Sequence, residues 1–148
     1  MRNVQSFEAQ ARAQSKELLQ AIEVAEAVIV STIERECEAL RAGRMLAAEA
    51  LRTRLRDAAS LYLNTMRAAR AAMWTMEQIL PGLDEVMEER RATFAALLKI
   101  EMAVLATERA AAETGLHFAS ADRAVERATA APAPSRMRRR RQRLRRAS

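Results

Sequence analysis

The chain has few of the residues that turn a polypeptide back on itself. Its 148 residues include three glycines and three prolines, whereas ordinary chains contain roughly 7% glycine and 5% proline. Each pair of neighbouring strands in a sheet needs a connection, and glycine and proline are the residues that tight turns use most. The scarcity of both residues therefore predicts an all-α fold.

Residues that commonly form catalytic or metal sites are also scarce. Cys37 is the only cysteine, which excludes an intrachain disulfide and favours a reducing compartment. We expect Cys37 to act as a small buried hydrophobic residue. His117 is the only histidine and follows Thr114 by three residues, so the Glu-x-x-His pairs of di-iron bundles are absent. We also find no nucleophile–histidine pair and no glycine-rich phosphate loop, and we therefore expect no enzyme activity, no metal and no cofactor.

No apolar run is long enough to suggest a membrane span. The most apolar window, AIEVAEAVIVSTI at 21–33, is short and contains two glutamates, whereas a spanning helix needs about 20 mostly apolar residues. The N-terminal residues MRNVQSFEAQ also lack the apolar core of a secretory signal. We expect a cytoplasmic protein that does not insert into membranes.

What the sequence does contain is a helical period in its apolar residues. In the first segment, 4–42, apolar residues recur every three or four positions, which places them on one face of a helix. These are Leu18, Ile22, Ala25, Ile29, Ile33, Cys37 and Leu40. Gly43 follows directly and fits the position after a helix end, where glycine adopts a left-handed conformation without steric cost.

Two further helices are predicted beyond that corner. The second, 44–80, carries a similar stripe of Leu51, Leu55, Ala58, Tyr62, Met66, Ala69, Met73, Met76 and Leu80. Pro81 and Gly82 end it, because proline disfavours helix in the residue before it. The third helix, 83–113, opens with acidic residues and has a stripe of Leu83, Met87, Phe94, Leu98, Met102 and Leu105. Short connections make successive helices antiparallel. The sequence therefore predicts an elongated antiparallel three-helix bundle over residues 1–114.

The C-terminal segment differs from this body. Residues 136–148 contain eight arginines and no acid; removing these from the 25 basic residues leaves 17 against 19 acidic residues, a net charge of −2 for residues 1–135. We predict that 115–148 is weakly helical to disordered. The arginines could serve specific nucleic-acid binding, non-specific binding of polyanions, or no function, although no aromatic residue lies between them to stack on bases.

The apolar residues exceed what a narrow seam requires. Leu19, Val24, Val28 and Val30 widen the apolar face of the first helix. Methionines on the second and third stripes fill a core or give an adaptable surface that accepts more than one partner. Two interpretations of the surplus stay open, a self-association interface and a groove for the helix of a client protein.

Residues 33–66, IERECEALRAGRMLAAEALRTRLRDAASLYLNTM, resemble the FlgN-type flagellar export chaperones, especially those of alphaproteobacterial type. The matching residues are Glu36, Ala39, Leu40, Arg41, Ala42, Gly43, Ala47, Ala48, Leu51 and Tyr62. The stretch LLKIEMAVLATERAAAE at 97–113 is similar to the third helix of such proteins. The resemblance covers about residues 20–114. The family's C-terminal tyrosine has no counterpart after Tyr62.

The resemblance implies a small cytoplasmic chaperone. Such a protein binds hook-associated flagellar subunits, prevents their premature assembly and delivers them to the type III export gate. We expect helix-in-groove contacts with the client at Leu98, Met102, Leu105, Leu116 and Phe118. The alternative is a coiled-coil scaffold or nucleic-acid-associated protein that uses the arginine-rich tail.

Overall fold

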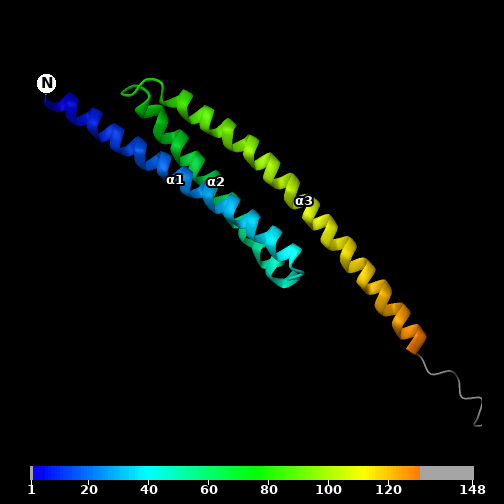
Figure 1. Cartoon of the computed structure of the whole chain (residues 1–148). Helices are drawn as coiled ribbons and strands as arrows, with labels where there is room; N and C mark the ends of the chain where they lie inside the picture. The colour runs from blue at the N-terminus through cyan, green and yellow to red at the C-terminus, as the bar shows by residue number, and fades with distance from the viewer. Residues whose placement is uncertain (1, 131–148) are drawn as a thin grey trace, which may run out of the picture. The chain divides into compact units, whose positions relative to one another are not determined.

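The chain folds into helices. A computed structural model describes the backbone of residues 2–130, and their side chains except those at 2, 117, 118 and 120. It contains α1 (Arg2–Arg41), α2 (Met45–Met76) and α3 (Leu83–Ala130), with no strand in the described part (Figure 1). The predicted all-α class is confirmed. The arginine-rich segment at 136–148 lies outside the described residues, as does the predicted disorder there.

The corner between α1 and α2 is formed by Gly43, as predicted. Its φ is +70°, in the left-handed region that glycine reaches without strain. The Arg44 N–H donates to the Ala39 carbonyl at 2.8 Å, and the Gly43 N–H donates to the Leu40 carbonyl at 3.1 Å. These two bonds form a Schellman motif, which satisfies carbonyl groups that the end of α1 would otherwise leave unpaired.

The second turn begins earlier than predicted. Helix α2 ends at Met76 instead of near Leu80. The Glu77 carboxylate accepts hydrogen bonds from the backbone N–H groups of Gly82 and Asp84, each at 2.9 Å. These bonds to Gly82 and Asp84 lower the pKa of Glu77 below its ordinary value. The glutamate thus organises a turn that the sequence pattern had assigned to helix.

Helices α1 and α2 pack closely and antiparallel. Ile33 and Leu40 of α1 share a buried cluster with Leu51 near the start of α2, whereas Ile22 meets Met73 near its end. Cα atoms of the two helices approach within 8 Å. This is possible because many of the buried residues between them are alanines, whose small side chains let backbones approach. They are Ala25, Ala39, Ala48, Ala58 and Ala69.

Helix α3 joins this hairpin through larger side chains. Within the unit Met1–Ala112, it contributes Met87, Phe94 and Leu105 to the buried clusters. These three side chains are larger than the alanines that line the contact between α1 and α2.

Helix α3 also continues beyond its predicted end near 113, and its last residue is Ala130. Residues from Glu113 onward belong to a second unit, Glu113–Ser148. Gly115 costs a helix only about 1 kcal/mol relative to alanine. The alanines between 119 and 130 favour helix, so a single glycine does not end it.

None of the helices described for residues 2–130 is both long enough and apolar enough to cross a membrane.

The alanine interface gives a stability prediction. Ala69 is fully buried beside Ile22, whereas the neighbouring Ala68 is exposed. Ala69→Leu should lower the free energy of unfolding by about 1–3 kcal/mol, because the extra volume forces the helices apart. Ala68→Leu should change it by less than about 0.5 kcal/mol. Urea denaturation followed by circular dichroism measures both values, and equal effects would contradict the close packing at Ala69.

The Glu77 turn gives a pH prediction. Because the folded state lowers the pKa of Glu77, its contribution to stability is present above the ordinary glutamate pKa and is lost as pH falls through the lowered value. The amide resonances of Gly82 and Asp84 should titrate together, with a midpoint below the ordinary glutamate pKa, in NMR spectra. Glu77→Gln should abolish this shared titration. Its persistence in the variant would assign the effect to another group.

Candidate functional site

Three of the grooves in the unit Met1–Ala112 run between different pairs of helices, and a further one lies between Phe7 of α1 and Ala72 of α2 near the second turn. The first lies between α1 and α3 and is lined by Leu19, Glu26, Val86, Glu89, Arg90, Thr93, Phe94 and Leu97. The second lies between α2 and α3, and the third between α1 and α2. Their side chains decide which of them can receive a partner.

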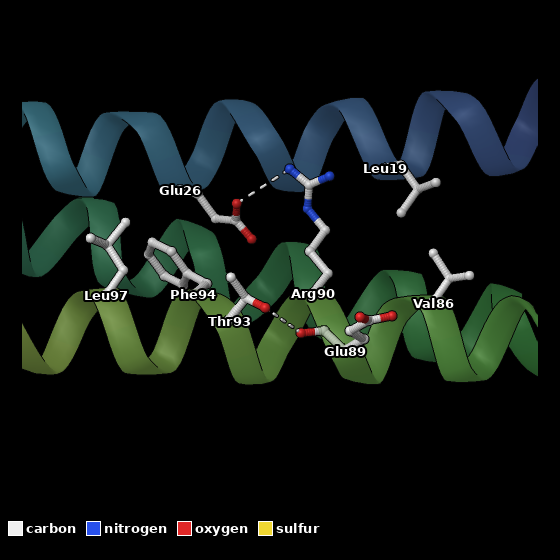
Figure 2. Close-up of a pocket in the computed structure, with 8 residues that line it drawn as sticks. All are labelled: Leu19, Glu26, Val86, Glu89, Arg90, Thr93, Phe94 and Leu97. Atoms are coloured by element: carbon white, nitrogen blue, oxygen red, sulfur yellow. Dashed lines mark hydrogen bonds and ion pairs between the residues drawn. The ribbon is translucent and has the colours of Figure 1, made fainter.

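An ion pair crosses the α1–α3 groove. Figure 2 shows the Arg90 side chain of α3 reaching toward Glu26 of α1, and its Nη2 donates to Glu26 Oε2 at 3.3 Å. In the same view, Leu19 and Val86 lie to one side of this pair and Phe94 and Leu97 to the other. The pair divides the apolar surface of the groove. We interpret it as a brace between two helices and not as an open binding site.

A second charged contact joins all three helices. The Glu36 side chain on α1 is fully buried. Arg109 of α3 donates from Nε to Glu36 Oε1 at 2.8 Å and from Nη2 to Oε2 at 3.0 Å. Arg52 of α2 places its Nε 3.7 Å from the same Oε1. This Glu36 cluster fixes the position of α3 along the hairpin, because a bidentate pair tolerates little sliding.

This cluster was not predicted from the sequence. Glu36 was named there only as one of the residues that carry the family resemblance, and its burial was not expected. The available signal was spacing: Glu36 lies three residues after Ile33 and four before Leu40, on the apolar face of α1. Cys37 itself is buried, as predicted, and burial raises the pKa of its thiol.

The groove between α1 and α2 has a mixed surface. We call it the hairpin groove; it has a volume of about 670 Å³ and contains no residue of α3. Val24, Val28 and Leu61 are its exposed large apolar residues. Arg35, Arg54 and Asp57, together with two hydroxyl side chains, interrupt them. Apolar and polar side chains therefore alternate over this face.

The groove between α2 and α3 is lined mainly by apolar side chains. It has a volume of about 360 Å³ and is lined by Tyr62, Leu63, Met66, Arg67, Arg70, Arg91, Phe94, Ala95 and Leu98. The rings of Tyr62 and Phe94 lie 5.0 Å apart between centroids and close its inner side. Leu63 is 54% exposed. We call this site the arginine-rimmed groove.

Its charged residues are all arginines. Arg91 is paired with Glu88 of the preceding turn, which lowers the pKa of Glu88. Arg67 and Arg70 have no carboxylate within 4.0 Å in the part of the chain that the structure describes. The groove thus combines an apolar floor with cationic groups at its edge, an arrangement suited to binding.

The residues expected to contact a client are distributed over different environments. Leu98 lines the arginine-rimmed groove, and Met102 is 39% exposed on α3. Leu105 is fully buried and is not available to a partner in this conformation. Leu116 is exposed in the second unit, and the side chain of Phe118 lies outside the described residues, as does that of His117.

Other residues of the arginine-rimmed groove were not among the client contacts expected from the sequence. Leu63, Arg67 and Arg70 follow each other at spacings of four and three residues, which places them along one side of α2. This signal was present in the sequence. It was not recognised, because Tyr62 and Met66 of the same segment belong to the apolar stripe and Leu63, Arg67 and Arg70 lie beside that stripe.

Within residues 2–130, no group of three or more histidine, cysteine or acidic side chains is arranged to hold a metal ion. Comparisons with protein-family models, with curated proteins and with solved structures find no match for this chain. The function must therefore be argued from the residues themselves.

The Glu36 cluster gives a prediction for a matched pair of variants. Glu36→Gln leaves two arginines without their buried counter-charge and should lower the free energy of unfolding by about 2–3 kcal/mol. Glu34→Gln, at an exposed position on the same helix, should change it by less than about 0.5 kcal/mol. Urea denaturation compares the two. Equal stability of both variants would show that the cluster does not hold α3 on the hairpin.

Proposed function

We propose that this chain is a cytoplasmic flagellar export chaperone of the FlgN type. It binds hook-associated subunits, prevents their premature assembly and delivers them to the type III export apparatus. In this proposal the helices form an elongated antiparallel three-helix bundle. The similarity of residues 33–66 and 97–113 to that family supports the proposal.

The observation that carries the proposal is the mainly apolar lining of the arginine-rimmed groove. Leu63 is 54% exposed, whereas Ala58 and Ala69 to either side of it in α2 are buried. An amphipathic helix can cover such a surface with apolar residues spaced three and four apart. Met66 gives the groove an adaptable wall, since its unbranched side chain can repack around different clients.

The groove also explains how binding would prevent assembly. A client segment that lies in the groove has its apolar face covered, so that face is not available to other subunits. Because the site lies at the surface, the segment can leave it again at the export gate without unfolding of the chaperone. Leu98, one of the contacts expected from the sequence, belongs to this site.

The alternative function is a coiled-coil scaffold or nucleic-acid-associated protein, favoured by the eight arginines of 136–148. It requires an affinity for DNA or RNA that falls steeply with salt concentration. Truncation after Ala131 removes these arginines. If the truncated protein loses nucleic-acid binding but still supports motility, the tail is not needed for the chaperone function.

The proposal predicts different effects for two leucines on the same helix. Leu63 in the arginine-rimmed groove and Leu61 in the hairpin groove are 54% and 52% exposed. Leu63→Asp should weaken binding of the C-terminal helical segment of a hook-associated subunit at least about tenfold, a loss of about 1.4 kcal/mol. Leu61→Asp should leave the affinity unchanged. Titration calorimetry measures both.

Calorimetry at several temperatures should also show a negative heat-capacity change for the unmodified protein, the mark of apolar burial. No binding to any hook-associated subunit would overturn the proposed function. A larger effect of Leu61→Asp than of Leu63→Asp would show that the client binds in the hairpin groove instead.

A further inference from the structure

We infer that the arginine-rimmed groove selects a helix that carries acidic residues along both edges of its apolar face. This inference rests on the proposed function, because it specifies the chemistry of the client segment at the same site. Its basis is the distribution of charge among the three grooves, together with the positions of three arginines.

The arginines lie on both sides of the apolar floor. Arg67 and Arg70 come from α2, whereas Arg91 comes from α3. An acidic residue at either edge of a bound helix would therefore meet a guanidinium group. Arginine suits this role because its planar group pairs with a carboxylate through two hydrogen bonds.

Two of these arginines have their charge available. Arg67 and Arg70 make no ion pair with any described residue. Arg91 already pairs with Glu88. We therefore expect the α2 side of the groove to determine charge selection and the α3 side to contribute less.

The other two grooves do not share this character. The α1–α3 groove contains Glu26 and Glu89 with Arg90, and the hairpin groove contains Asp57 with Arg35 and Arg54. Among these three grooves, only the α2–α3 groove has cationic side chains and no carboxylate in its lining. The positive rim is thus a property of one site and not of the whole surface, since residues 1–135 have a net charge of −2.

The size of the groove defines the length of the segment. The α2 residues in its lining extend from Tyr62 to Arg70, a distance of about 12 Å along a helix that rises 1.5 Å per residue. A partner helix of about three turns covers this floor. It would place apolar residues three and four apart against Leu63, Met66 and Leu98, and acidic residues beside them.

The test uses the full-length protein and two synthetic amphipathic peptides as probes. Both peptides carry the same leucine pattern over about three to four turns, with glutamates along the edges in one and lysines in the other. We expect the glutamate peptide to bind at least tenfold more tightly, measured by fluorescence anisotropy. Its affinity should fall as salt concentration rises, because exposed charge pairs are screened.

A matched pair of double variants locates the selection. R67E/R70E reverses the unpaired arginines of the rim, and R35E/R54E makes the same change in net charge at the hairpin groove. We expect R67E/R70E to reverse the preference between the two peptides and R35E/R54E to preserve it. The arginine-rich tail attracts the glutamate peptide equally in both double variants, so the difference between the two variants is assigned to the groove. Circular dichroism confirms that each variant is folded.

Three outcomes would overturn the inference. They are equal affinity for the two peptides, the same effect from both double variants, and displacement of the glutamate peptide by single-stranded DNA of equal charge. The last would identify the rim as a polyanion site. If hook-associated subunits bind, but the two peptides bind equally well and R67E/R70E changes neither affinity, the inference fails and the proposed function stands. If the glutamate peptide binds and no hook-associated subunit does, the proposed function fails and the inference stands.

Discussion

The buried carboxylate of Glu36 is the interaction on which the arrangement of this unit depends. It lies on α1, pairs through two hydrogen bonds with Arg109 of α3, and has Arg52 of α2 beside it. Such a buried pair contributes little net stability compared with an apolar contact, because both charges lose water. Its contribution is to fix the positions of the three helices relative to one another. Each helix supplies one member, so the cluster sets where α3 lies along the hairpin and which side chains of α2 and α3 face each other across the groove.

Side-chain size differs between the two kinds of helix contact in this unit. Alanines bring the backbones of α1 and α2 close together. Helix α3 meets the hairpin through larger side chains, with Phe94 against Tyr62 of α2 and with Arg90 and Arg109 against glutamates of α1. The arginine-rimmed groove lies beside the contact of Tyr62 with Phe94, and both rings belong to its lining. The side chains that hold α3 on the hairpin therefore also form part of the surface that we propose for client binding.

The sequence predicted the features that depend on local chemistry. Gly43 had to follow a helix end because its position breaks the apolar period, and its left-handed φ agrees. The end of α2 and the length of α3 were not predicted. The Glu77 side chain reorganises the second turn through bonds to amides five and seven residues away, and Gly115 proved too weak a signal to stop a helix rich in alanine. The position of Arg109 against Glu36 depends on residues 73 positions apart, which helical periodicity does not describe.

The burial of Cys37 has a practical consequence. Its thiol lies in a cluster that includes Leu105 of α3, and the raised pKa keeps it protonated. A protonated, enclosed sulfur reacts slowly with oxidants, so two copies of the chain in contact would not become linked by a disulfide while they stay folded. The sulfur becomes reactive only when the helices around it separate. The rate at which an alkylating reagent modifies Cys37 therefore measures how often the surrounding helices separate, and no additional cysteine has to be introduced.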